Sequence, residues 1–477
     1  MSACHPDAPY DYSRTMRKPF GGLRRERPQA GPIPEQPPTP PLHQTPLFAS
    51  LHLERRSATR PFDLLPDALV QVTARDVPAG ELTLTDVGPV AAHLSVRAEG
   101  LGPQARFGLV GPDDAALLCG VEGARLVLRA GWAPGSAVLA DSPLPSGTAT
   151  LTLTGTTATV WDGTRPTAQT QVPADLFGDL RRADVVSTLT YAWAEVASAA
   201  AGAFGHVGLR DPQLVTDAFG AAVLREGRVL VTFTCAGPGD VTCAHWGLFS
   251  IDPANPLDPS PEAAVFFARD GLIVGDHAGQ LIVQDEGADA IVSTWGTFDP
   301  ADPQVLVRRA ALPGLPGPGV QVVDAEPFPL PTDVSCWDPS LTRYAGYDYV
   351  GFTECWRFVP EFEFRPALAR RRADDPHAAF DRIGADTMHL QTEGTLFVRE
   401  RGEPLLLASD AKARDYPVYR LDMSRIGRVQ APYESGIPHP CLVRLPGRPA
   451  FMMTSDDTPW DASLPPGSHG DLVVYGA

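Results

Sequence analysis

The second half of the chain repeats one design five times, and this repetition limits the fold more than any other feature. Each unit opens on a turn with a polar or charged group, enters a short strand and continues into a second, apolar strand. Repetition at roughly 40–65 residues is typical of a β-propeller, in which each unit forms one blade around an axial channel. Five units predict five blades, with the polar groups pointing into the channel. The units begin near Arg210-Asp211-Pro212, Gly275-Asp276-His277, Trp337-Asp338-Pro339, Thr392-Glu393-Gly394 and Pro438-His439-Pro440.

Residues 62–196 also predict an all-β structure. The segment 148–154, TATLTLT, alternates with period two, as half-buried strands do. The chain holds 44 Gly and 50 Pro, which favours short strands joined by turns. We therefore expect a β-sandwich, similar to the jelly-roll modules attached to carbohydrate-active enzymes. Residues 195–206, EVASAAAGAFGH, are expected to form a linker or short helix before a propeller over 206–477.

The N-terminal segment, residues 1–61, differs from both regions. Eight prolines lie between Pro28 and Pro46, with few large apolar residues among them. Such a composition offers little surface to bury and favours extended backbone. We expect an extended or disordered arm.

Charge and cysteine content limit the partners and the compartment. The 39 Lys and Arg residues stand against 57 Asp and Glu, a formal net charge of −18, which argues against nucleic-acid and anionic-membrane partners. Apolar stretches are too short for a membrane span, and the first thirty residues contain no apolar run of the secretory type. The seven widely spaced cysteines fit buried thiols better than a disulfide framework. These features predict a cytoplasmic protein.

Three of the repeated units open on a carboxylate within a short motif, in the order Asp, Asp, Glu, and the last unit carries a histidine. This ordered set resembles the five-bladed propeller glycoside hydrolases of the arabinanase/β-xylosidase type, glycoside hydrolase family 43 and its relatives. The resemblance covers roughly residues 206–477. The motifs are Arg210-Asp211-Pro212-Gln213-Leu214, Trp337-Asp338-Pro339-Ser340-Leu341, Thr392-Glu393-Gly394-Thr395-Leu396-Phe397 and Gly436-Ile437-Pro438-His439.

The resemblance implies an inverting glycosidase with a role for each carboxylate. Inversion needs one carboxylate to activate water and one carboxylic acid to protonate the leaving oxygen, with about 6.5–9.5 Å between them. By the resemblance, Asp211 would be the general base and Glu393 the general acid. Asp338 would be the neighbour that raises the pKa of the acid. The substrate expected is an arabinofuranoside or xyloside in a short oligosaccharide or glycoside, with no cofactor required.

Further residues beside these turns are candidates for substrate or cation binding. Indole rings can stack on sugars, although packing between blades explains tryptophans equally well. Calcium could bind near the histidine, where family members often carry a cation, or in the acidic run 455–461, although a solvated loop explains that run better. No paired zinc spacing occurs. The candidates for substrate binding are Asp276, His277, Trp295, Trp337, Trp356, Arg414 and His439, and the last of these is also the candidate cation ligand.

Two alternative functions remain open at this point. The Arg-Asp-Pro motif is better known from fructan-acting propellers, which use a retaining mechanism with a Glu-Cys acid motif. Glu354-Cys355 occurs in this chain, but 143 residues after Asp211, further than the next blade would place it. A sugar-binding propeller without turnover is the other alternative, and product release would distinguish it from a hydrolase.

Overall fold

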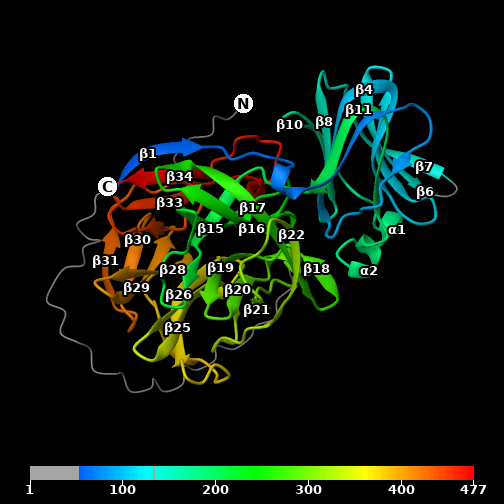
Figure 1. The fold of residues 1–477 in the computed structure, drawn as a ribbon. Helices are drawn as coiled ribbons and strands as arrows, with labels where there is room; N and C mark the ends of the chain where they lie inside the picture. Colours follow the sequence, from blue (N-terminus) through cyan, green and yellow to red (C-terminus); the bar gives the residue numbers. More distant parts are fainter. Residues whose placement is uncertain (1–52, 133–134, 477) are drawn as a thin grey trace.

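The computed structural model describes residues 53–132 and 135–476, which lie in two regions of sheet (Figure 1). Strands make up 59% and helices 5% of the structure, so the all-β prediction is confirmed. The short helices are η3 (Asp67–Leu69), α1 (Ala174–Phe177), α2 (Ala183–Val186), η4 (Val241–Cys243), η5 (Trp295–Thr297) and η6 (Pro466–Ser468).

The N-terminal region is one hydrogen-bonded sheet of ten strands. Two separate sheets were expected, but β4 and β11 are long enough to pair along their whole length and join the strands into one. The sheet surrounds a single apolar core, and its edge strands β7 and β10 contact each other. Its strands are β2 (Val70–Val77), β3 (Thr83–Leu84), β4 (His93–Val110), β5 (Ala116–Glu122), β6 (Arg125–Trp132), β7 (Gly135–Pro143), β8 (Thr148–Thr154), β9 (Thr157–Asp162), β10 (Arg165–Gln171) and β11 (Thr190–Ala203).

The expectation of a linker or short helix at 195–206 is wrong, because most of this segment belongs to β11. Ala199 pairs with Ala74 on one side and with Ala98 on the other, so the segment lies inside the sheet. Its small residues fit this crowded position. A Cβ atom at Gly202 would lie 2.1 Å from the carbonyl oxygen of Leu69.

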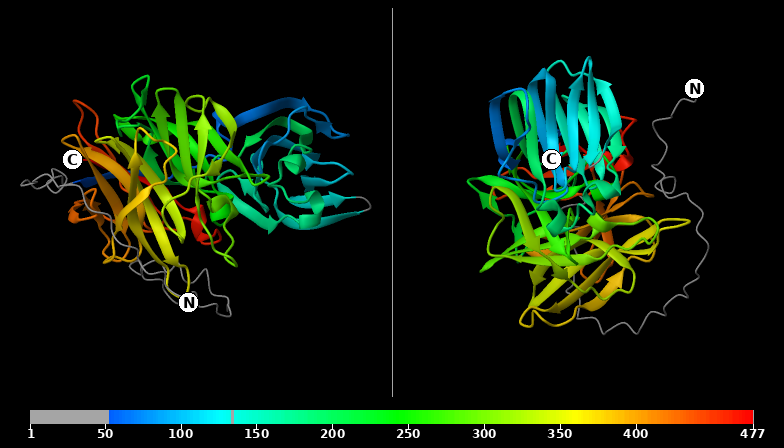
Figure 2. Two further views of the ribbon diagram at one scale, coloured as in Figure 1. Left: turned by 90° about the horizontal axis from the view of Figure 1, so that it is seen from below. Right: turned by 90° about the vertical axis from the view of Figure 1, so that its right-hand side faces the viewer.

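Five further sheets follow in a propeller-like arrangement. We call the strand that opens each of the five sequence repeats the first strand of its sheet, namely β12, β19, β24, β28 and β32. Of these, β12 contacts β19, β19 contacts β24, β24 contacts β28, and β12 also contacts β32. Both views in Figure 2 show the ten-stranded sheet standing to one side of them. The first sheet holds β12 (Leu209–Leu214), β14 (Leu224–Arg225), β15 (Arg228–Cys235), β16 (His245–Asp252), β17 (Asn255–Arg269), β18 (Leu272–Val274) and β22 (Gly319–Asp324). The second holds β13 (Thr216–Asp217), β19 (His277–Gln284), β20 (Gly287–Ser293), β21 (Val307–Leu312) and β23 (Glu326–Pro327).

The remaining three sheets have four strands each. The third holds β24 (Ser335–Tyr344), β25 (Tyr347–Arg357), β26 (Glu363–Arg372) and β27 (Asp381–Ala385). The fourth holds β28 (Thr392–Glu400), β29 (Glu403–Asp410), β30 (Tyr416–Tyr419) and β31 (Arg425–Val429). The fifth holds β32 (Cys441–Val443), β33 (Phe451–Asp456), β34 (Asp471–Gly476) and β1 (Glu54–Thr59).

Strand β1 comes from the segment that the sequence analysis assigns to the N-terminal arm. It pairs antiparallel with β34, so the end of that segment completes the fifth sheet. Pairing with β1 covers an edge of β34 that would otherwise be open. Residues 1–52 of the arm lie outside the described residues.

A buried contact of aromatic and imidazole rings joins the ten-stranded sheet to the first of the five sheets. His93 of β4 lies 6.0 Å from His245 of β16 and 5.4 Å from Phe266 of β17, measured between ring centroids. His245 stacks on Phe266 at 5.3 Å. All three rings are buried, so the two regions share one interior at this point.

Six of the seven cysteines lie in the described part of the chain, and each is a buried free thiol, as predicted. Cys4 lies outside the described residues. Within the described residues, no helix is long and apolar enough to span a membrane.

Candidate active site

The first strands of four sheets share a bulge that sets the direction of the key side chains. In β12, β19, β24 and β28 the pairing register shifts across two residues. The first of these two has a left-handed backbone in each strand, with φ of 49° at Asp211, 52° at Ala278, 51° at Asp338 and 71° at Gly394. Aspartate and glycine tolerate this conformation better than most residues. A bulge redirects a side chain away from the regular alternation of a strand.

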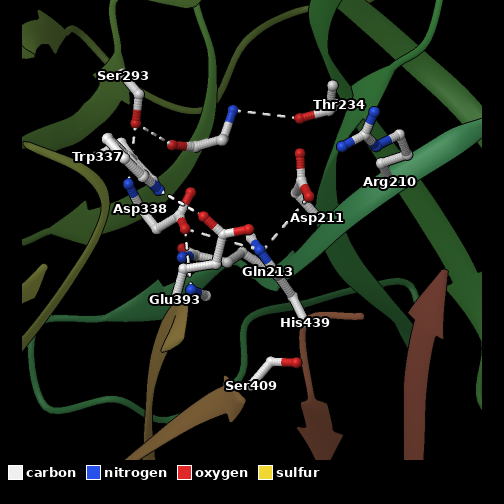
Figure 3. Close-up of polar contacts among 12 residues, drawn as sticks. Arg210, Asp211, Gln213, Thr234, Ser293, Trp337, Asp338, Glu393, Ser409 and His439 are labelled. Atoms are coloured by element: carbon white, nitrogen blue, oxygen red, sulfur yellow. Dashed lines mark hydrogen bonds and ion pairs between the residues drawn. The ribbon is translucent and has the colours of Figure 1, made fainter. Parts of the chain in front are cut away.

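The bulges bring three distant carboxyl groups together around His439 (Figure 3). His439 Nδ1 lies 3.5 Å from Asp211 Oδ1, and its Nε2 lies 3.6 Å from Asp338 Oδ2. The backbone N–H of Gly394 donates to Asp338 Oδ2 at 2.9 Å, which places the adjacent Glu393 beside Asp338. The carboxylates predicted from three separate repeats therefore form one group.

Glu393 is held by the indole of the preceding sheet. Trp337 Nε1 donates to Glu393 Oε2 at 2.8 Å. Gly394 makes room for the histidine next to it, because a Cβ atom there would lie 2.5 Å from Cδ2 of His439. The Glu-Gly pair thus supplies a carboxyl group and the space beside it.

The environments of the three carboxyl groups differ, and so do their pKa values. Burial raises the pKa of Glu393 to about 8 against the hydrogen bond from Trp337, and the nearby charge of Asp211 adds to this rise. Burial also raises the pKa of Asp338 well above its usual value, with further contributions from Glu393 and Asp211. Glu393 therefore favours the protonated form at neutral pH.

Asp211 is affected in the opposite direction. Burial acts to raise its pKa, but His439 in its protonated form, the Arg210 guanidinium and a hydrogen bond from Thr234 outweigh burial and lower it. The Asp211 side chain is 13% exposed, so solvent reaches it. The site thus pairs an ionised carboxylate with a protonated carboxylic acid.

Two residues that the sequence analysis did not assign to the site extend it around Asp211. Arg210 Nε lies 3.5 Å from Asp457 Oδ2. Burial raises the pKa of Asp457 to about 6, and Arg210 opposes this rise. Asp457 comes from the acidic run considered for calcium, whereas its neighbour Asp456 accepts from the backbone N–H of Thr458 at 3.0 Å. The sequence could have indicated that Asp457 lies near Asp211 only through its distance along the chain from the other motifs, and that distance follows no fixed rule.

Asp276 and His277 behave differently from the prediction. The carboxylate of Asp276 is fully buried and accepts from Arg269 Nε at 2.5 Å and from Arg269 Nη2 at 2.8 Å. It is therefore a structural ion-pair partner and not a member of the group, because the bulge gives the corresponding position to Ala278. His277 is buried with Nδ1 2.9 Å from the carbonyl oxygen of Gly275. Burial lowers the pKa of His277, against the contact with Gly275 and the nearby charge of Asp211.

The predicted tryptophans divide into two sets. Trp337 binds Glu393, and Trp295 packs on Trp337 with ring centroids 5.3 Å apart. Trp356 is 41% exposed and lies 4.7 Å from the guanidinium of Arg365, outside the carboxyl group cluster.

Arg414 also lies outside the contacts that join the three carboxyl groups. It donates to the carbonyl oxygen of Tyr433 at 2.9 Å, and its guanidinium covers the Tyr433 ring. The hydroxyl of Tyr433 lies 2.9 Å from Ser409 Oγ. Among the residues the structure describes, no three His, Cys, Asp or Glu side chains are grouped so that they could hold a metal ion.

Comparison with known proteins gives similarity at the level of structure only. No family model and no curated protein matches the chain. The family 117 glycoside hydrolase Zg3597 of Zobellia galactanivorans is 11% identical, with 56% of this chain and 84% of that chain covered and a TM-score of 0.37. The GH43_1 enzyme of Xanthomonas citri, complexed with xylose, is 13% identical over 56% and 87% of the two chains, with a TM-score of 0.40. A family 32 glycoside hydrolase of Bifidobacterium adolescentis is 10% identical over 82% and 74%, also with a TM-score of 0.40. These similar structures include the group of enzymes that the sequence motifs resemble.

Proposed function

We propose that this protein hydrolyses a glycosidic bond with inversion at the anomeric carbon. The observation that carries the proposal is the pair of opposite protonation states in one site. The pKa of Asp211 is lowered, whereas that of Glu393 is raised to about 8. An ionised base and a protonated acid at neutral pH are what this reaction requires.

In the proposed reaction Asp211 accepts a proton from a water molecule as the water oxygen attacks the anomeric carbon. Glu393 donates its proton to the glycosidic oxygen as the bond to the anomeric carbon breaks. Asp211 ends protonated and Glu393 ionised, and exchange of one proton through solvent restores both groups. Asp338 acts beside Glu393: the charge of an ionised Glu393 raises the pKa of Asp338, so the two buried groups disfavour carrying two negative charges together.

The substrate class in this proposal is a pentofuranoside or pentopyranoside. Arg210 and Asp457 lie beside Asp211 and offer a guanidinium donor and a carboxylate acceptor of the kind that sugar hydroxyl groups bind. We further propose that residues 206–477 form a five-bladed propeller and residues 62–196 a separate domain. The five consecutive sheets and the contacts between their first strands support the first of these.

The retaining alternative finds no support in the position of Glu354. Its buried carboxylate is bound by Arg382 and lies 4.0 Å from Arg365 Nε. It takes no part in the contacts that join Asp211, Asp338 and Glu393.

A screen of aryl glycosides of arabinose, xylose, fructose and galactose tests the proposal, with NMR of the first anomer released. Inversion should be seen, and Asp211→Asn and Glu393→Gln should each abolish turnover without changing the melting temperature. Asp299→Asn is the matched control, because Asp299 also precedes a proline but accepts from the backbone N–H of Ala301 in a turn. Full activity in either site variant, with an unchanged melt, would refute the assigned roles.

A further inference from the structure

The two sides of the carboxyl group cluster differ in chemistry. Around Asp211 lie charged and hydrogen-bonding groups, namely Arg210, Thr234, His439 and Asp457. Around Glu393 the contact is aromatic, because Trp337 both binds the carboxyl group and packs into a cluster of rings. Figure 3 shows Arg210 and Trp337 on opposite sides of the carboxyl groups.

The aromatic cluster beside Glu393 is continuous. Trp337 lies 5.3 Å from Trp295, 6.0 Å from Phe358 and 5.9 Å from Phe362, measured between ring centroids. Phe358 in turn stacks on Phe362 at 5.4 Å. Phe298 lies 5.7 Å from Phe358 and 5.2 Å from Trp295.

The cluster runs from the interior to the surface. Trp337 is 1% exposed, whereas Trp295, Phe298, Phe358 and Phe362 are only partly buried. Val359, next to Phe358 in the hairpin between β25 and β26, is 43% exposed. We call the four partly buried rings the aromatic wall. Aromatic side chains that stay partly open to solvent beside a polar site are typical of ligand-binding surfaces.

The general acid defines which part of a glycoside lies on its side of the site. It must reach the glycosidic oxygen, so the group attached to that oxygen, the aglycone, lies beyond Glu393 and away from Asp211. On the basis of the proposed function, we infer that the aromatic wall binds the aglycone, and that the substrate is a glycoside whose aglycone presents a flat apolar face. The charged groups around Asp211 then bind the hydroxyl groups of the sugar that is released.

The test compares aglycones that differ in apolar face and not in leaving-group strength. The probes are the 2-phenylethyl and n-propyl arabinofuranosides and the corresponding xylosides, because both alcohols are unactivated. Stacking on the wall predicts a kcat/KM for the phenylethyl glycoside about tenfold higher than for the propyl glycoside. Phe358→Leu and Phe362→Leu should each reduce this ratio, because they should lower kcat/KM for the phenylethyl glycoside more than for the propyl glycoside.

Phe219→Leu is the matched control. Its ring is 57% exposed, and its carbonyl oxygen accepts from Arg399 near the opposite end of the first strands. The ratio should not change in this variant. A ratio near one in the wild type, or a ratio that survives both substitutions in the wall, would overturn the inference and leave the proposed hydrolase in place. Absence of turnover throughout the aryl-glycoside screen would instead overturn the proposed function, and this inference with it.

Discussion

Replacing Trp337 by phenylalanine should extend activity to higher pH. The indole Nε1 donates to Glu393 Oε2 at 2.8 Å, and this hydrogen bond stabilises the ionised carboxylate. It therefore holds the pKa of Glu393 down, against the burial that raises it to about 8. A phenylalanine keeps an aromatic ring in the cluster but removes the donor.

The size of the shift follows from the strength of that hydrogen bond. A hydrogen bond to a charged group contributes about 1.5–3 kcal/mol. One pKa unit corresponds to about 1.4 kcal/mol, so loss of the donor should raise the pKa of Glu393 by about one to two units. In the proposed reaction Glu393 acts while protonated, so the alkaline limb of the profile should move upward by that amount. The acidic limb, which Asp211 sets in the same proposal, should stay where it is.

The assay is the pH dependence of kcat/KM from pH 4 to pH 10, with the best glycoside from the screen. This parameter reports the ionisation of the free enzyme. Trp295→Phe is the control, because Trp295 packs on the ring of Trp337 and its loss leaves the bond to Glu393 intact. An alkaline limb that stays in place or moves downward in Trp337→Phe would refute Glu393 as the acid that this limb reports.

Two further predictions concern stability. Gly394→Ala should destabilise the fold by about 1–3 kcal/mol and reduce activity, because φ is 71° and the new Cβ would meet the His439 ring. Thermal melting measures the loss of stability, and kcat measures the loss of activity. Wild-type values for both would contradict the prediction. Burial lowers the pKa values of His93 and His206 to about 4 in the folded protein. In the unfolded chain the same imidazoles bind protons near pH 6.5, so the unfolded state is favoured as the pH falls. The free energy of unfolding should therefore fall between pH 6.5 and pH 4. Urea unfolding at pH 7 and pH 4.5 measures this, and His93→Phe should lose part of the pH dependence; an equal dependence in the variant would contradict it.

Apolar patterning located the strands but not the pairing between distant segments. The first and second strands expected in each repeat coincide with β12 and β15 and their counterparts, because alternating and apolar runs reflect burial directly. Pairing of β1 with β34 joins residues more than 400 positions apart, and no local pattern encodes that. The same holds for β11, whose alanines resemble a linker in composition and acquire their meaning only between two neighbouring strands.

The site shows the same division between local signal and tertiary context. Asp211 and Asp299 both precede proline, yet one lies in the site and the other accepts from a turn N–H. The order of the three carboxylate motifs, and not any one of them, distinguished the two. Asp276 was expected in the channel because it precedes a strand, but the bulge begins two residues later at Ala278. Asp457 was missed because it follows a strand instead of preceding one.

The repeated bulge explains how one backbone design produces opposite protonation states. Four first strands share the same two positions: the residue before the bulge and the first residue of the bulge. The chemistry depends on how these two positions are filled. Where Arg210 precedes the bulge and Asp211 begins it, the charges of His439 and Arg210 lower the pKa of the carboxylate. Where Glu393 precedes the bulge and Gly394 begins it, the glycine leaves room for His439. The Glu393 carboxyl group accepts a hydrogen bond from the Trp337 indole, and burial raises its pKa so that it keeps its proton. The second sheet has alanine in the first-residue position and adds no negative charge there. Asp211 is the one of the three predicted catalytic carboxylates whose pKa is lowered. The pairs in chain order are Arg210-Asp211, His277-Ala278, Trp337-Asp338 and Glu393-Gly394.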